Sequence, residues 1–232
     1  MKTSISQAPR GSVTRFLNLE LRSLFLLISL LAFYILVPVL ETERTGELVL
    51  AGGLALVLTA AALEVSERNS RLLIAVLVAA GGIAFHVIGH FIYRTSAMKL
   101  TSGLATASFL GFVVANMLRY LGRPGAITKA RLYVSVSLYF LLGIIWFALY
   151  RIANLAQPGS FAEAGATLSG TVPPSKFLYF SLVTLTTLGY GDIVPVRPFA
   201  RSLATLEAAA GILYIAITVA RLVAAYQSAP RE

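Results

Sequence analysis

The chain has 232 residues, of which 57% are apolar and only 12% are charged, and its formal net charge is +9. Apolar runs of nearly 20 residues recur, each long enough to cross about 30 Å of hydrocarbon, so the composition excludes an ordinary soluble domain. The basic residues lie in the short segments between these runs, which is typical of membrane topology and argues against nucleic-acid binding. Because there is no cysteine, disulfides, thiolate metal sites and cysteine nucleophiles are excluded.

Hydrophobicity predicts membrane helices along most of the chain. A first apolar run is too long for a signal peptide and lacks a small-residue cleavage site, so we expect it to be retained. A short apolar stretch, Lys176–Leu185, cannot span and is predicted to be a re-entrant helix. The fold class is therefore an all-α membrane protein with one re-entrant helix and six transmembrane helices, at Ser23–Leu40, Glu47–Leu63, Leu72–Tyr93, Leu100–Leu118, Leu132–Ala153 and Phe199–Tyr226.

The distribution of Lys and Arg predicts that both termini lie in the cytoplasm. With this orientation twelve basic residues are cytoplasmic and seven are on the outer side. The basic linker 122–131 would then lie on the inner leaflet, where each base gains about 1 kcal/mol from anionic lipid. The expected organisation is a cytoplasmic segment 1–22, a four-helix membrane domain 23–121, this linker, a second membrane domain 132–226 and a short tail 227–232.

A polar, glycine-rich segment, TTLGYGD at 186–192, follows the re-entrant helix. Irregular backbone is tolerated at membrane depth only where protein buries it or water wets it, so we expect this segment to line a path. Gly189 and Gly191 alternate with Leu188 and Tyr190, and glycine adopts left-handed conformations at little cost. An alternation of left-handed and right-handed backbone conformations turns successive carbonyls to the same side, where they can replace the water shell of a cation. One chain supplies only one wall, so a homo-oligomer is expected.

The same segment, Thr186–Asp192, resembles the selectivity filter of P-loop potassium channels, with Leu188 in place of the commoner valine. The resemblance extends from about Leu132 to Tyr226 and implies an outer helix, a turret, a pore helix, the filter and an inner helix. It implies a homotetrameric, multi-pass channel of the cell membrane that passes K⁺ passively, with K⁺ as permeant ion, no cofactor and no enzymatic activity. The residues that would bind K⁺ are Thr187, Leu188, Gly189, Tyr190 and Gly191.

The resemblance also assigns roles beside the filter. Thr186 would line the cavity entrance, and Asp192 would lie at the outer mouth. Val183 stands where some members have a glutamate that braces this aspartate, and Tyr179 stands where members often have an aromatic residue that hydrogen-bonds it. We therefore expect the filter to be braced by Tyr179 and Asp192 without a glutamate.

Three positions of the last span are candidates for a gate. Gly211 lies 19 residues after Asp192, where family members often have a hinge glycine. Glycine weakens a helix by about 1 kcal/mol relative to alanine, but a small residue is equally expected where helices pack closely, and the sequence leaves both open. Ile215 and Val219 share a face and would either form apolar rings that gate by dewetting or pack between helices.

Glu207 is a carboxylate well inside the last predicted span. Such residues rarely face lipid, and we expect it to be hydrogen-bonded to Ser181, to Thr184 or to a neighbouring subunit. Both a structural role and a modulatory role are compatible with the sequence.

The first four spans contain little that could sense voltage. The fourth span carries only Lys99, Arg119 and Arg123, all near its ends. Moving one charge through the membrane yields about 2.3 kcal/mol per 100 mV, so weak or absent voltage dependence is expected. His86 and His90 share a face of the third span and would bind a metal, sense protons or simply hydrogen-bond between helices.

Two other functions are compatible with parts of the sequence. A potassium-transporter subunit would resemble four joined pore loops, whereas this chain has one such segment. A membrane metal or pH sensor built on His86 and His90 lacks a third ligand.

Overall fold

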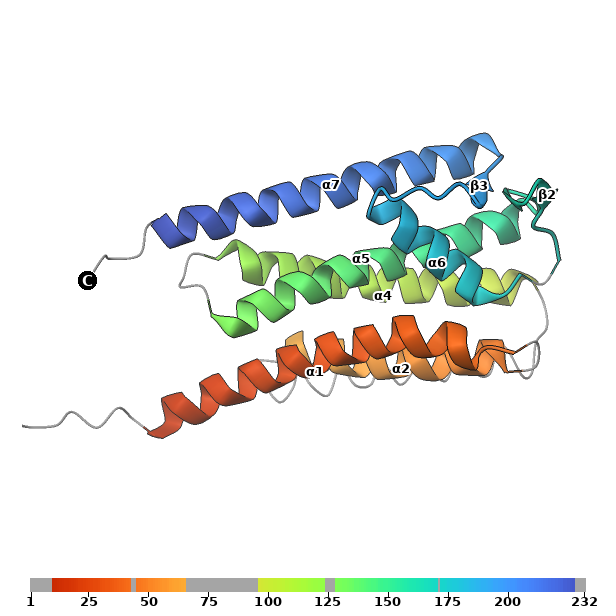
Figure 1. Cartoon of the computed structure of the whole chain (residues 1–232). Coiled ribbons are helices and arrows are strands. Elements are labelled where there is room, and N and C mark those ends of the chain that lie inside the picture. Colours follow the sequence, from red (N-terminus) through yellow and green to blue (C-terminus); the bar gives the residue numbers. More distant parts are fainter. Residues whose placement is uncertain (1–9, 43–44, 66–95, 124–127, 171, 228–232) are drawn as a thin grey trace, which may run out of the picture.

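The computed structural model describes residues 10–42, 45–65, 96–123, 128–170 and 172–227, and this part of the chain is mostly helical (Figure 1). The helices are α1 (Arg10–Leu40), α2 (Gly46–Val65), α4 (Ser96–Gly122), α5 (Lys129–Ala156), α6 (Pro174–Leu185) and α7 (Pro198–Gln227). Three short strands are β1 (Phe161–Glu163), β2 (Ala166–Thr167) and β3 (Ile193–Pro195).

Four of the described helices are long and apolar enough to cross a membrane, at Leu19–Leu40, Gly103–Gly122, Lys129–Ala156 and Pro198–Ala224. They correspond to the first, fourth, fifth and sixth predicted spans. The second predicted span forms α2, whose apolar part, Leu48–Ala61, is shorter than the other four. The third predicted span, with His86 and His90, lies outside the described residues. The described structure is thus that of a helical membrane protein with four candidate spans.

Helix α5 is the centre of the molecule and contacts α1, α4, α6 and α7. In Figure 1, α7 lies on one face of the middle layer formed by α4, α5 and α6, and α1 and α2 lie on the opposite face. The core between the layers is built mainly from leucine, valine and phenylalanine, as expected where apolar helix faces meet. Fully buried examples are Leu26 and Leu30 of α1 and Leu138, Leu141 and Ile144 of α5.

The expectation of an all-α fold missed a small antiparallel sheet with strand order β2-β1-β3. Strands β1 and β2 lie in the connection between α5 and α6, and β3 begins directly after Asp192. Glu163 pairs with Ile193, and the backbone N–H of Ala164 donates to the carbonyl of Asp192 at 3.4 Å. Strands of two or three residues are too short to show the alternation by which strands are predicted. The sheet fixes the end of the polar segment 186–192 against the α5–α6 connection.

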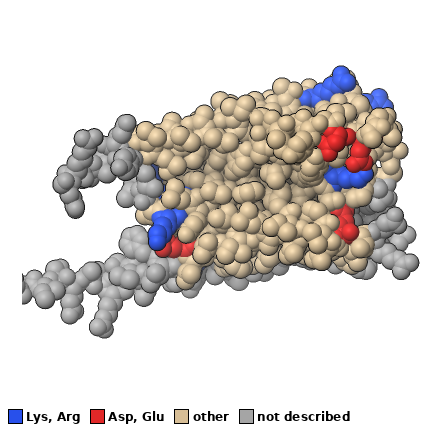
Figure 2. Space-filling model, in the orientation of Figure 1, with Lys and Arg blue, Asp and Glu red and all other residues tan. Residues whose placement is uncertain are grey.

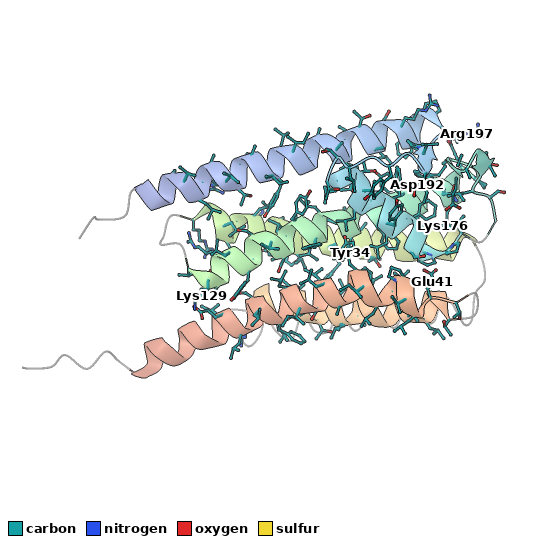
Figure 3. The ribbon with its side chains drawn as sticks, in the orientation of Figure 1. Tyr34, Glu41, Lys129, Lys176, Asp192 and Arg197 are labelled. Carbon is teal, nitrogen blue, oxygen red and sulfur yellow. The ribbon has the colours of Figure 1, made fainter. Side chains whose placement is uncertain are left out.

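Charged side chains gather at the two ends of the molecule, and the body between them is uncharged on the face shown in Figure 2. Helix α1 begins and α7 ends at the same end (Figure 1). Asp192, Lys176 and Arg197 lie at the opposite end, and Lys129 lies near the end at which α1 begins (Figure 3). Several large apolar side chains of α1 and α7 are exposed, such as Ile28 and Leu213, as expected for surfaces that face lipid or a partner chain.

Candidate functional site

Helix α6 precedes the polar segment and is fixed at its N-terminus by a distant residue. Pro174 begins the helix, where its missing N–H costs nothing, but Pro173 supplies no side-chain cap. Instead Glu41, just past the end of α1, accepts a hydrogen bond from the backbone N–H of Ser175, with 2.9 Å between N and Oε2. A carboxylate is favoured at the positive end of a helix. This contact, which sequence analysis missed, ties the first helix to α6.

The φ angle alternates in sign along the backbone after α6. The φ angles of Thr187, Gly189 and Gly191 are +58°, +57° and +79°, whereas Leu188 and Tyr190 have negative φ. The two glycines follow the predicted alternation, and Thr187 extends it by one residue. A β-branched residue at positive φ is strained by roughly 1–2 kcal/mol. The surrounding contacts must therefore hold this conformation.

Those contacts come mainly from the carbonyl of Val183. It accepts hydrogen bonds from the N–H groups of Leu188 at 2.9 Å and Gly189 at 3.3 Å, while Thr187 donates its N–H to the carbonyl of Thr184 at 2.9 Å. The sequence comparison placed Val183 where some channels have a bracing glutamate, a role that its apolar side chain cannot fill. In the structure Val183 supports the segment through its backbone carbonyl instead. These hydrogen bonds direct the N–H groups of the segment back toward α6.

The side chain of Asp192 ends the segment in a hydrogen-bonded position. Tyr179 on α6 donates its hydroxyl to Asp192 at 2.6 Å, and the N–H of Ile193 donates to the other carboxylate oxygen at 3.0 Å. The predicted Tyr179–Asp192 hydrogen bond is therefore present. It stabilises the carboxylate and the neutral phenol, so it lowers the pKa of Asp192 and raises the pKa of Tyr179 to about 12.

Glu207 lies on α7 behind α6 and is fully buried. Its Oε1 is 2.5 Å from the hydroxyl of Ser181, and its Oε2 accepts a hydrogen bond from the hydroxyl of Tyr150. The predicted contact with Ser181 is present, whereas the contact with Tyr150 of α5 was missed. Glu207 thus connects α5, α6 and α7.

The structure separates the three gate candidates. A Cβ atom at Gly211 would lie 2.0 Å from the carbonyl oxygen of Leu185, so α7 and the end of α6 approach as closely as glycine permits. This geometry favours the close-packing explanation of Gly211. Ile215 and Val219 lie further along α7, and each is about half exposed in the single chain. Thr186 ends α6, and its hydroxyl donates to the carbonyl of Leu182 at 2.8 Å.

A family model described as "Ion channel" matches residues 134–228. The inward rectifier potassium channel Kirbac3.1 of Paramagnetospirillum magnetotacticum is 32% identical over 86 residues, which are 37% of this chain and 25% of the relative. The potassium voltage-gated channel protein shk-1 of Caenorhabditis elegans is 37% identical over 90 residues, which are 38% of this chain and 17% of the relative.

A third relative, the two pore potassium channel c of Oryza sativa subsp. japonica, is 35% identical over 79 residues, or 34% of this chain and 15% of the relative. The chain therefore spans a quarter or less of the length of these relatives. No solved structure matches significantly. The matched family and relatives are ion channels rather than enzymes. Taken with the apolar helices, these matches indicate a multi-pass membrane protein whose C-terminal part, residues 134–228, is similar to ion channels, potassium channels among them.

Proposed function

We propose that the protein is a potassium-selective channel that passes K⁺ passively through a pore formed by four copies of the chain. The filter is Thr186–Asp192, and α6 is its re-entrant pore helix. The observation that carries the proposal is the alternation in the sign of φ along the segment, with positive values at Thr187, Gly189 and Gly191. A segment with this alternation presents carbonyl oxygens along one side, and rows of carbonyls can replace the hydration shell of K⁺.

The contacts around the segment are compatible with K⁺ binding by its carbonyls. The N–H groups of Leu188 and Gly189 are bound by Val183, so they do not oppose a cation on the other side. The C-terminal end of α6, at Leu185, carries partial negative charge and lies directly before the segment. The proposed K⁺ ligands are the carbonyls of the filter, at Thr187, Leu188, Gly189, Tyr190 and Gly191, and K⁺ is bound as the permeant ion rather than as a cofactor.

Exposure supports an assembly around the filter. Every residue from Thr186 to Asp192 is exposed in the single chain, although its backbone is strained at Thr187. A strained segment persists only where its surroundings determine it, so further copies of the chain are the expected neighbours. The exposed apolar face of α7, with Ile215 and Val219, is available to line the pore or to pack against those copies. Closed cyclic symmetry with four copies would supply neighbours both for the strained segment and for the exposed apolar face of α7.

The proposed orientation places both termini in the cytoplasm. Helix α1 begins and α7 ends at one end of the molecule, and the filter lies at the other (Figure 1). The basic linker 122–131 joins α4 to α5 at the cytoplasmic end, where anionic lipid is its expected partner. Since α4 has basic residues only near its ends, conduction is expected to depend weakly on voltage. No observation within the described residues favours a transporter subunit or a sensor built on His86 and His90.

A flux assay with two matched glycine variants tests the proposal. Gly189 and Gly170 both have positive φ, at +57° and +80°, and neither has an atom within 4 Å of an added Cβ. Alanine at either position therefore costs about the same backbone strain, roughly 1–2 kcal/mol. Gly189 lies in the filter, whereas Gly170 lies in the connection between β2 and α6.

In liposomes, the wild type is expected to carry a K⁺ flux that barium blocks and that exceeds the Na⁺ flux. Gly170→Ala should keep this flux, and Gly189→Ala should lose it. Equal K⁺ and Na⁺ flux in the wild type would contradict the proposed selectivity. A Gly189→Ala variant that conducts like Gly170→Ala would show that the ion path does not run along this segment.

A further inference from the structure

The contacts of Glu207 form one continuous chain of polar groups inside the protein. The carbonyl of Gly143 on α5 lies 2.7 Å from the hydroxyl of Ser181 on α6, and this hydroxyl lies 2.5 Å from Oε1 of Glu207 on α7. Oε2 of Glu207 is bound by the hydroxyl of Tyr150 on α5. Ser181 and Glu207 are fully buried, and so is Tyr150.

The number of hydrogens available to these hydrogen bonds determines whether the carboxyl group of Glu207 is protonated. The three contacts need three hydrogens, and the hydroxyls of Ser181 and Tyr150 supply two. The carbonyl of Gly143 can only accept, so Ser181 gives its hydrogen to Gly143. An ionised Glu207 would then face Ser181 with two acceptors and no hydrogen between them. A protonated Glu207 supplies the third hydrogen and donates it to Ser181.

The surroundings agree with this count. A buried carboxylate is strongly disfavoured unless a cation pairs with it. Among the residues that the structure describes, the titratable groups that interact with Glu207 are phenols, namely Tyr34 of α1 and Tyr139 and Tyr150 of α5, which are neutral at pH 7. The ion pair between Lys176 and Glu163 lies at the end of the molecule and does not include Glu207.

We propose that Glu207 is a neutral carboxylic acid that positions the pore helix α6 against α5 and α7. Its effect on conduction rests on the proposed channel function, but its protonation does not. Ser181 lies one helical turn before Leu185, and Gly211 lies one turn after Glu207. The Glu207–Ser181 contact and the Gly211–Leu185 contact therefore fix one turn of α7 against one turn of α6. Opening movements of α7 are then confined to the part beyond Gly211, which carries Ile215 and Val219.

Infrared spectroscopy of the purified full chain tests the protonation. At pH 7 the wild type should show a carboxylic acid C=O stretching band that is absent from Glu207→Gln. Ser181→Ala should shift this band, because the acid loses its acceptor. Glu163→Gln is the matched control, since Glu163 is part of a partly exposed ion pair, and it should leave the band unchanged. Loss of only carboxylate bands in Glu207→Gln would overturn the proposal, and this outcome is independent of conduction.

Potassium flux in liposomes tests the positioning role. Glutamine can donate to Ser181 and accept from Tyr150 as the acid does, so Glu207→Gln should keep the flux within about twofold of the wild type. Glu207→Ala removes both bonds and should reduce the flux at least tenfold. If Glu207→Gln and Glu207→Ala lose equal flux, a neutral donor and acceptor is not what the site requires, and the proposal fails. If the wild type carries no flux, the channel function fails while the infrared result still decides the protonation.

Discussion

The substitution Gly211→Ala separates the two roles that the sequence allows for this glycine. In an isolated helix, alanine would stabilise α7 by about 1 kcal/mol. In the structure the added Cβ would lie 2.0 Å from the carbonyl oxygen of Leu185 and 3.0 Å from its carbonyl carbon. Both are backbone atoms, so no change of rotamer relieves the overlap. The end of α6 and the adjoining turn of α7 would have to separate by roughly 1 Å.

The cost of the steric overlap is expected to exceed the stabilisation that alanine gains from its higher helix propensity. Overpacking a well-packed contact costs typically about 1–3 kcal/mol, and more where backbone must move. Because both overlapping atoms are backbone, we take the upper part of this range, about 2–3 kcal/mol, so the net loss after the propensity gain of about 1 kcal/mol is about 1–2 kcal/mol. For a chain of this size, about 1 kcal/mol shifts Tm by 2–4 °C, so Gly211→Ala should lower the Tm in detergent by several degrees. The flux should also fall, because Leu185 adjoins the proposed filter.

Gly111→Ala on α4 is the control for this experiment. Gly111 is also a helical glycine, but no atom lies within 4 Å of an added Cβ, so its Tm should be unchanged or slightly raised. If Gly211→Ala instead raises Tm as Gly111→Ala does, the close contact is not what requires glycine. Altered opening in such a stable variant would then favour a hinge.

Three further outcomes follow from the hydrogen bonds of the site. Tyr179→Phe removes the hydroxyl bound to Asp192 and should shorten conducting episodes in single-channel records while K⁺/Na⁺ selectivity is kept; unchanged records would count against the brace. Because the pKa of Asp192 is lowered in the folded protein, its stabilisation is present above the unfolded value of 3.8 and is lost as pH falls through the folded value. The Tm values of the wild type and Tyr179→Phe should therefore converge in acid, and a constant difference would refute this. Glu41→Ala removes the acceptor for Ser175 and should cost about 1 kcal/mol in thermal unfolding, whereas Glu41→Gln, which keeps an acceptor, should cost less.

The elements with strong local signals were predictable from the sequence. The predicted spans Leu132–Ala153 and Phe199–Tyr226 differ by a few residues from α5 and α7, because long apolar runs and flanking polar residues mark such helices. Helix α6 was predicted from Lys176, two residues inside its observed start at Pro174. Helix α1 extends back to Arg10, well before the predicted Ser23, since a helix need not end where its apolar run ends.

The contacts that complete the site were not predictable, because each joins segments that are far apart in the chain. Glu41 reaches Ser175 across 134 residues, and no local pattern distinguishes it from other acidic residues of the same loop. Tyr150 is one of many aromatic residues of an apolar helix, and its bond to Glu207 depends on how α5 packs. The positive φ of Thr187 contradicts the usual preference of a β-branched residue. Local propensity fails here because tertiary contacts determine the backbone.

These tertiary contacts explain how the strained backbone at Thr187 can persist. Helix α6 is held at its start by Glu41, in its middle by Glu207 and at its end by the hydroxyl of Tyr139, which donates to the carbonyl of Leu185 at 3.1 Å. With both ends and the middle of α6 held, the carbonyl of Val183 has a determined position, and that carbonyl binds the N–H groups next to Thr187. Strain of about 1–3 kcal/mol is sustainable only with such support.

The first helix and the residue that follows it have a part in this support that does not require a row of basic residues. Glu41 caps α6, and Tyr34 of α1 donates its hydroxyl to the carbonyl of Phe140 on α5 at 3.0 Å. The same helix buries Leu26 and Leu30 in the core that it shares with α5. A membrane domain that positions α5 and α6 in this way needs close packing and hydrogen bonds rather than a row of arginines. The scarcity of charge in the fourth span is therefore compatible with a domain that supports the proposed filter mechanically.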